Sequence, residues 1–462
     1  MFRPARRTGS PAGIPANPLA CPPALGHGAA MRFSPGSFPL RLGLAFVLAW
    51  VAGPGRAAEK THRDFRAEAA AAYGKKDYAA ALAATAAALA LRPDSPRYLY
   101  NLAAMHALLG ARDEALRALG RLAALGVYLP AETDKDFASL QGEAEFRRLV
   151  QQLQAHREPK GTADVVGELP GRTGILEGLA FRPRTGDLFL GDVHHRCIWR
   201  RDRDGQVHRF SAEDEELFGC FALAIDEARN TLWAVTTATP EMAGYTAEMK
   251  GTTGVAEFNL ATSELRRVVF LPGDGRDHFL GDLLLLEDGS VIATDSRAPV
   301  LWRLPAGAEE WIKVAESPAF ASLQGVAAWR RDLVVTDYSN GLFAVDPVRG
   351  SVRPLAAPPG TTLLGVDGLV ALPDSLVAIQ NGVVPQRVLR LTLDPAAETI
   401  TSVQVLAAGL PHLTDLALIT LVNELPTFIA GSGWDLFDPA KAKTPPAHTV
   451  RIFQLPPSAP IP

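Results

Sequence analysis

The sequence predicts an α+β multidomain chain, in which a small all-α helical-repeat head precedes a six-bladed all-β propeller. Two observations carry this prediction. A pattern of short apolar runs separated by turn residues recurs about six times between residues 163 and 455. Residues 61–156 have a different texture, because alanine is dense there and the apolar positions follow a helical period.

The β repeat is clearest in its first unit. Residues 176–181, 186–192 and 197–199 form three apolar runs, and turn-forming residues separate them. The period of the repeat is roughly 43 to 60 residues, near the roughly 40 to 50 of propeller repeats. About six units fall within the roughly four to eight blades of known propellers. Later units open at Phe221, Gly281, Gln324, Asp367 and Thr414.

Residues 164–169 form a further strand-like run before the first unit. We expect this strand to complete the last blade and close the ring. Closure removes the exposed sheet edges that would otherwise pair with other chains.

Composition limits the broad class of the protein. A chain of 462 residues suggests two or three domains, and 47% hydrophobic with 21% charged residues is ordinary for a globular protein. The formal net charge of −4 argues against a nucleic-acid partner, which would require a basic surface.

Residues 1–58 are predicted to be a leader. The first thirty residues are rich in Pro, Ala and Gly, and Met31 then opens a basic start, an apolar run at 42–52 and small residues near Ala57 and Ala58. We interpret residues 1–30 as a mis-extended start and the rest as a signal peptide. The apolar run is shorter than the roughly 20 residues of a membrane span, so we expect no span after leader removal. A short membrane anchor is the alternative.

Export predicts a periplasmic or secreted protein, and this bears on the cysteines. Cys21 would leave with the leader, and Cys197 and Cys220 would remain. In an oxidising compartment these two can pair, or they can stay as buried free thiols. A Pro-rich tail, 456–462, ends the chain.

The head contains an internal repeat. Residues 74–82 and 108–116 match each other at a spacing of 34 residues, the tetratricopeptide period. We predict helices at 77–92, 96–109 and from 112, and a closing helix around 145–149. Two repeats are fewer than the roughly three that such arrays need, so the closing helix or packing on the propeller must complete the head. The head is either a docking groove for a protein partner or a structural cap.

Propeller geometry places the residues that open each first strand around the central channel at one mouth. This ring contains Glu177, Gln324 and Asp367, with Asp282 and Asp415 one step further along two strands. Two carboxylates and a carboxamide can form an oxygen cage for a hard divalent cation, Ca²⁺ foremost. Glu177 and Asp367 can instead line a wet channel or cap inter-strand amides.

Loops at the same mouth add further candidates. His194 and His195 can act as a general base, or they can belong to a solvent-exposed loop. Asn381 follows a second strand in the fifth unit. Long inserts at 236–254 and 431–448, the second with Trp434, predict a lid over a pocket; decoration is the other interpretation.

At these residues the chain resembles the regucalcin/gluconolactonase superfamily of six-bladed propellers. The phrase around Glu177-Gly178-Leu179 is similar to that family's first metal motif, and Asp367-Gly368-Leu369 to its later motif, whose aspartate is a metal ligand and proposed proton acceptor. The resemblance covers residues 163–455 and leaves out the head. The family usually has asparagines where this chain has Gly281 and Gln324.

The resemblance implies a metal-dependent lactone or ester hydrolase. Glu177, Gln324 and Asp367 would hold the cation, Asp282 is a further candidate, and Asp367 or a mouth histidine would be the base. The alternative is a non-catalytic propeller that binds a small molecule or peptide, with a head that recruits a protein partner.

Overall fold

The computed structural model describes residues 60–212, 217–394, 396, 399–437 and 445–457. The predictions for the leader at 1–58, and most of the Pro-rich tail, therefore fall outside the described residues. Within the described part of the chain, no helix combines the length and apolar character that a membrane crossing needs.

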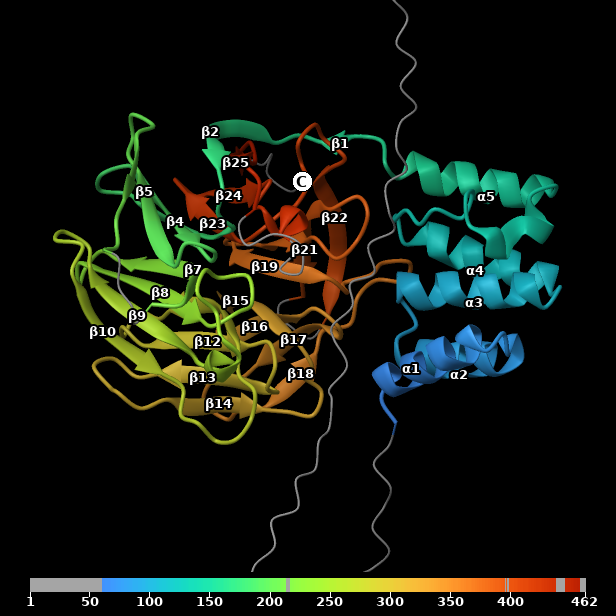
Figure 1. The fold of residues 1–462 in the computed structure, drawn as a ribbon, viewed down its shortest axis with the longest axis horizontal. Helices are drawn as coiled ribbons and strands as arrows, with labels where there is room; N and C mark the ends of the chain where they lie inside the picture. The colour runs from blue at the N-terminus through green and yellow to red at the C-terminus, as the bar shows by residue number, and fades with distance from the viewer. Residues whose placement is uncertain (1–59, 213–216, 395, 397–398, 438–444, 458–462) are drawn as a thin grey trace, which may run out of the picture. The chain divides into compact units, whose positions relative to one another are not determined.

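Six antiparallel sheets follow one another along the chain and surround a central axis, as predicted (Figure 1). In each sheet the first strand of the blade is innermost. Blades one to three contain β3 (Leu176–Arg182), β4 (Asp187–Asp192), β5 (Cys197–Arg201), β6 (Val207–Arg209), β7 (Gly219–Asp226), β8 (Thr231–Thr237), β9 (Thr253–Asn259), β10 (Leu265–Phe270), β11 (Leu280–Leu285), β12 (Val291–Asp295), β13 (Val300–Leu304) and β14 (Ile312–Glu316).

Blades four to six repeat the arrangement, with one addition. Blades four and five contain β15 (Leu323–Trp329), β16 (Asp332–Asp337), β17 (Gly341–Val345), β18 (Val352–Pro354), β19 (Val366–Ala371), β20 (Leu376–Gln380), β21 (Arg387–Leu393) and β22 (Ile400–Ala408). Blade six contains β23 (Ile419–Val422), β24 (Leu425–Ala430), β25 (His448–Gln454) and β2 (Asp164–Arg172). A short strand, β1 (Lys160–Gly161), adds a fifth strand to blade five.

The ring closes as the sequence predicts. Strand β2 pairs antiparallel with β25, so the first propeller strand of the chain is the outermost strand of the last blade. The segment before it is not a free linker, because Gly161 pairs with Ala407 and Thr162 donates to the carbonyl of Leu406. One start was misplaced: blade six does not open at Thr414, because Asp415 has a left-handed backbone (φ 52°) and the strand begins at Ile419.

The second strands explain the apolar runs in the sequence. Every residue of β4, β8, β12, β16 and β20 is buried, since these strands have a neighbouring strand on each side and a neighbouring blade on each face. Such strands show continuous rather than alternating hydrophobicity.

The innermost strands share a bulge at one position. In blades one to five the pairing register between the first and second strands shifts just after the opening of the first strand. A bulge bends a strand and turns a side chain away from the regular alternation. The residues at these shifts include Glu177, Phe221, Gly281, Gln324 and Asp367.

Glycine follows the ring residue in three blades, and the packing between blades requires it. A Cβ on Gly178 would lie 1.9 Å from the carbonyl oxygen of Phe221 in the next blade, and one on Gly325 would lie 2.4 Å from that of Asp367. The inner strands therefore approach each other too closely for any side chain at these two positions.

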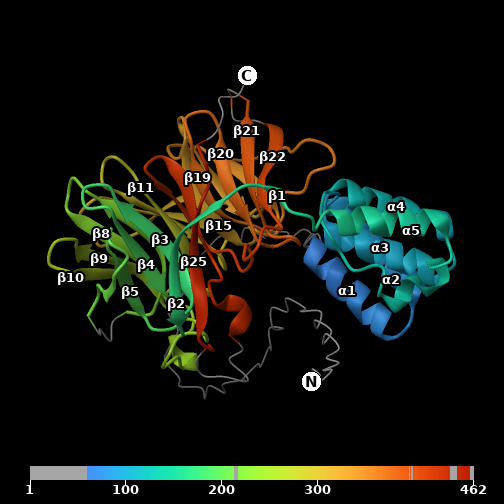
Figure 2. The same cartoon turned by 90° about the horizontal axis from the view of Figure 1, so that it is seen from above.

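The helical head consists of five α-helices and one 3₁₀ turn, and Figure 2 shows the helices side by side. They are α1 (His62–Gly74), α2 (Tyr78–Leu91), α3 (Pro96–Leu108), α4 (Arg112–Ala124), η1 (Lys135–Leu140) and α5 (Ala144–Ala155). Their starts follow local signals, since Thr61 and Asp64 form a capping box, Asp77 caps α2, and Ser95 caps α3 ahead of Pro96. The helices α2, α3 and α4 and the closing helix are as predicted, whereas α1 was not predicted as a separate helix. The assignment of the head as tetratricopeptide repeats stays a prediction.

Packing on the propeller completes the core of the head. Val383, from the loop between β20 and β21, lies in the same buried cluster as the head's Leu119, Phe137 and Leu153. The amide of Tyr128 donates to the carbonyl of Val384 at 2.6 Å. Blade five therefore supplies part of the apolar contact that buries the core of the head.

The close approach at Gly178 gives a direct test of the inner-strand packing. Gly178→Ala places a methyl group against the backbone of blade two, so we expect a loss of about 2 kcal/mol or more in the free energy of unfolding. Chemical denaturation measures it. Gly273→Ala is the matched control, because no atom lies within 4 Å of its Cβ position. Equal stability of the two variants would contradict the packing described.

Candidate active site

The residues at the bulges of the inner strands, here called the ring residues, differ in polarity from blade to blade around the axis. Glu177, Gln324 and Asp367 provide polar side chains from blades one, four and five, whereas blades two and three contribute Phe221 and the bare Gly281. The mouth therefore has a polar side with two carboxyl groups and an aromatic side.

The carboxyl groups at the axis influence one another. Burial, and then the nearby Asp367, raise the pKa of Glu177 well above its ordinary value, and Asp415 and Asp282 add to the effect. Burial raises the pKa of Asp367 to about 6, against a hydrogen bond from Asn381 that lowers it. Burial likewise raises the pKa of Asp282 to about 7, although two backbone amides oppose this. Lys, Arg and His are absent from the largest causes of these shifts.

Asp282 is a predicted metal ligand, but both of its carboxylate oxygens accept backbone amides. One oxygen accepts the amide of Leu283 at 2.8 Å, and the other accepts the amide of Val326 in the next blade at 3.0 Å. The carboxylate occupies the place that glycine takes in blades one, four and five, and it joins two inner strands. Its contacts are those of an inter-strand cap, a role that the sequence analysis considered for Glu177 and Asp367 and not for Asp282.

The side-chain amide of Asn381 binds Asp367 through its nitrogen, and its oxygen has no hydrogen-bond partner among the described residues. The Nδ2 of Asn381 donates to Asp367 Oδ2 at 2.6 Å and to the carbonyl of Leu416 at 3.0 Å. The Oδ1 of Asn381 is buried and has no hydrogen-bond partner among the described residues. A buried oxygen of this kind has a free-energy cost unless a donor or a cation approaches it.

Gln324 extends toward blade three. Its Nε2 lies 3.4 Å from Ser322 Oγ, and its Oε1 would lie 3.4 Å from a Cβ on Gly281. The longer side chain of Gln324 thus takes up space that the missing side chain at Gly281 leaves.

The side-chain oxygens of the ring residues and Asn381 are of the kind that binds a hard cation. The carboxylates alone are too few to hold one. Among the described residues, no group of three or more His, Cys, Asp or Glu side chains is arranged to hold a metal. The set that remains is mixed, with carboxylates from Glu177 and Asp367 and amide oxygens from Gln324 and Asn381. Such oxygen donors suit Ca²⁺ rather than a soft metal.

The sixth-blade insert reaches across the mouth. The indole N–H of Trp434, in η3 (Trp434–Leu436), donates to Glu177 Oε2. The start of the insert is fixed by Asp415, whose Oδ2 accepts the amide of Gly433 at 2.6 Å. The left-handed Gly433 (φ 109°) brings the turn against the carbonyl of Gly174. The insert therefore covers Glu177, as a lid would; residues 438–444 lie outside the described part.

His195 takes part in a contact that recurs around the ring, which we call the strand-end clamp. In the clamp an aspartate that ends a second strand accepts amides from the loop before the first strand and from the loop that follows it. Asp192, Asp295 and Asp337 do this in blades one, three and four.

Two clamps add a histidine and a tryptophan. Asp192 binds His195 Nδ1 at 2.8 Å and the indole of Trp199, and Asp295 binds His278 Nδ1 at 2.6 Å and the indole of Trp302. The aspartate hydrogen bond in each case raises the pKa of the histidine. The duplication in two blades favours a structural role for His195.

His194 is buried by the second-blade insert. Its Nδ1 lies 2.6 Å from the carbonyl of Glu241, and its carbonyl accepts the amide of Ala243. Its ring packs 5.5 Å from that of Phe437. The solvent-loop interpretation is therefore wrong for His194, which joins both inserts to blade one.

The two cysteines are buried and are not joined in a disulfide. Cys197 begins β5 and Cys220 lies near the start of β7, as the sequence predicts. Burial raises the pKa of the Cys220 thiol to about 12, so this thiol is unreactive at neutral pH.

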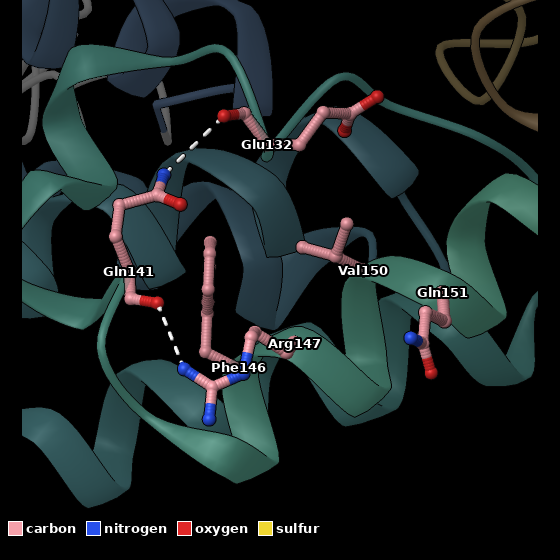
Figure 3. Close-up of a pocket in the computed structure, with 6 residues that line it drawn as sticks. All are labelled: Glu132, Gln141, Phe146, Arg147, Val150 and Gln151. Atoms are coloured by element: carbon pink, nitrogen blue, oxygen red, sulfur yellow. Dashed lines mark hydrogen bonds between the residues drawn. The ribbon is translucent and has the colours of Figure 1, made fainter.

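A depression of about 170 Å³ lies on the head, away from the propeller mouth. Figure 3 shows Gln141 bound to the carbonyl of Glu132, and Arg147 bound to the carbonyl of Gln141. Its polar atoms are largely occupied within the head, and no catalytic constellation is found there.

Comparisons with known proteins bear on the fold and not on the function. No protein-family profile matches the chain, and no curated protein matches it. Many solved structures are similar. A gluconolactonase from Xanthomonas campestris is 16% identical, with 65% of this chain and 99% of that chain covered and a TM-score of 0.43.

Other similar structures have different activities in their names. The PQQ-bound aldose sugar dehydrogenase of Streptomyces coelicolor is 14% identical over 64% of this chain and 100% of its own, with a TM-score of 0.43. Virginiamycin B lyase of Staphylococcus aureus is 12% identical over the same shares, also with a TM-score of 0.43. Likeness at this level carries no argument about chemistry.

The roles of three residues were missed from the sequence. Asn381, Trp434 and Asp415 were placed at the mouth, but their contacts with Asp367, Glu177 and the insert were not predicted. A carboxamide directly after a second strand was the one available signal for Asn381, and nothing local to Trp434 indicates its partner.

The buried acids predict an unusual pH dependence of stability. The pKa of Asp282 is higher in the folded protein than its ordinary value, so the folded state binds more protons between about pH 4 and pH 7 and stability falls as the pH rises through that range. Asp282→Asn should reduce this fall by on the order of 1–3 kcal/mol. Denaturation at several pH values, in chelator, measures it.

Glu309→Gln, on an exposed turn, is the control and should leave the pH profile unchanged. A parallel profile for Asp282→Asn and the parent protein would contradict the assigned burial of the acid.

Proposed function

We propose that the protein is a cation-dependent hydrolase of small lactones or esters. The observation that carries the proposal is the pair of Glu177 and Asp367 at the propeller mouth, next to the unpartnered Oδ1 of Asn381. The sequence motifs around Glu177 and Asp367 support the same class of reaction.

The electrostatics favour a cation among these residues. Buried carboxylates are stable only when they are paired, protonated or bound to a metal. Lys, Arg and His are absent from the largest causes of the pKa shifts of Glu177 and Asp367. A divalent cation held by Glu177, Asp367, Gln324 and Asn381 would polarise a substrate carbonyl and lower the pKa of a bound water.

Asp367 is suited to be the base. In the cation-free protein burial raises the pKa of Asp367 to about 6, and a bound cation would lower it, so the assignment of the base rests on the held carboxylate and the sequence motif rather than on that value. Asn381 holds one oxygen of the carboxylate in place and leaves the other for a proton. His194 and His195 are less suited, because His194 is buried beneath the second-blade insert and the aspartate contact of His195 is repeated at His278 in blade three.

The reaction is a simple hydrolysis. Water adds to the carbonyl carbon and gives a proton to Asp367. The bond between the carbonyl carbon and the ring or ester oxygen then breaks, and the proton passes to that leaving oxygen. The products are a hydroxy acid from a lactone, or an acid and an alcohol from an ester.

A non-catalytic binding function is the second candidate. The observation that favours it is Trp434, whose indole already occupies a carboxylate oxygen of Glu177. In that case the mouth binds a small molecule or peptide without reaction, and the head recruits a protein partner.

Substitution of the two acids tests the hydrolase proposal. Glu177→Gln and Asp367→Asn should each lower kcat/KM for lactone hydrolysis by about 10² to 10⁴. Glu309→Gln should leave it unchanged. Metal analysis of the purified protein should find a divalent cation that is lost in Glu177→Gln, and a chelator should lower the Tm of the parent only.

Two results would reject the hydrolase. One is the absence of hydrolysis across a panel of lactones and esters in added Ca²⁺, and the other is full activity in Asp367→Asn. A bound small molecule without turnover would favour the binding function.

We also propose that the protein is exported, on the basis of the basic start, apolar run and small residues at 31–58. Fusion of residues 31–60 to a reporter that is active only outside the cytoplasm should give activity, and N-terminal sequencing of the mature protein should begin near Ala58. Replacement of the apolar residues at 42–52 by polar ones should abolish both. A mature chain that still begins at Met1 would contradict export.

A further inference from the structure

Trp434 shows what kind of group fits beside Glu177. Its indole donates one hydrogen bond to the Glu177 carboxylate, and its ring lies 6.2 Å from that of Phe221 at an angle of 33°. A flat apolar body with one polar edge therefore satisfies both walls of the mouth. The protein's own side chain acts as a stand-in for a ligand at this place.

The aromatic side of the mouth continues beyond Trp434. The ring of Phe221 packs edge-on against Phe279 at 5.1 Å, and all three side chains belong to one apolar cluster. Phe221 takes the ring position that holds a carboxylate or carboxamide in blades one, four and five. Polar atoms that could bind several hydroxyl groups are therefore absent from Phe221 and Gly281, the ring positions of blades two and three.

We infer that the substrate is a lactone or ester with a flat apolar group, and that this group replaces the Trp434 indole against Phe221. Glu177, released from the indole N–H, would then hold the cation. The inference rests on the proposed hydrolase for the reaction, and on the contacts of Trp434 for the substrate class. A polyhydroxylated sugar lactone fits poorly, because its hydroxyl groups would lose water against aromatic rings without new partners.

The first experiment compares two neutral lactones, dihydrocoumarin and D-glucono-1,5-lactone. We expect kcat/KM to be at least about tenfold higher for dihydrocoumarin, the flat aromatic one. Trp434→Ala should lower KM for dihydrocoumarin, because it removes the intramolecular competitor. Phe221→Leu, which keeps an apolar side chain, should lower kcat/KM for dihydrocoumarin by about tenfold and leave the sugar lactone unaffected.

Phe270→Leu is the matched control for Phe221→Leu. Phe270 lies on the outer strand β10 and is 37% exposed, so the same change there should alter neither substrate. The opposite effects expected for Trp434→Ala and Phe221→Leu distinguish substrate contact from general destabilisation, which would weaken both variants alike.

The second experiment measures the binding of indole, which the protein cannot hydrolyse. Calorimetry should show that Trp434→Ala binds indole, and that 1-methylindole, which lacks the N–H donor, binds at least about tenfold more weakly. The parent protein, with Trp434 in place, should bind neither at the same concentration.

The outcomes separate the two proposals. Hydrolysis of neither lactone, together with indole binding to Trp434→Ala, rejects the hydrolase and supports the chemistry of the ligand. A preference for the sugar lactone, or no difference between indole and 1-methylindole, overturns the inference and leaves the hydrolase standing.

Discussion

The close approach of the inner strands is the constraint on which the rest of this structure depends. Gly178 and Gly325 leave no room for a Cβ, because the backbone of the next blade lies there. The strand bulge that accompanies this approach is repeated in five blades. It gathers one residue from each inner strand around the axis, and the chemistry of the mouth is the chemistry of those residues.

The collected side chains create a site that is electrostatically unbalanced. Burial raises the pKa of both Glu177 and Asp367, and Asp367 raises that of Glu177 further. Their hydrogen-bond partners are an indole and an amide. A site of this kind must retain protons or bind a cation. The strand-end clamps are the contrast: Asp192 and Asp295 are buried as well, but backbone amides and a histidine satisfy them.

The blades could be predicted from the sequence, but the contacts between them could not. Apolar runs and turn residues predict strands, because each second strand is buried on all sides, and residues 164–169 were recognisable as the closing strand. The left-handed Asp415 and the inter-blade cap at Asp282 were not predictable, since each depends on a partner from another element. The partners of Trp434 and Asn381 lie 257 and 14 residues away, and no local pattern encodes such pairings.

The central claim is that Glu177 and Asp367 form one coupled acid pair at the mouth. Carbon-13 NMR titration of the Asp and Glu carboxyl groups in the cation-free protein tests it most directly. The account predicts that both groups titrate above their ordinary range, and that Asp367→Asn moves the pKa of Glu177 downward. Independent titration of the two groups near their ordinary values, unchanged by that substitution, would contradict it.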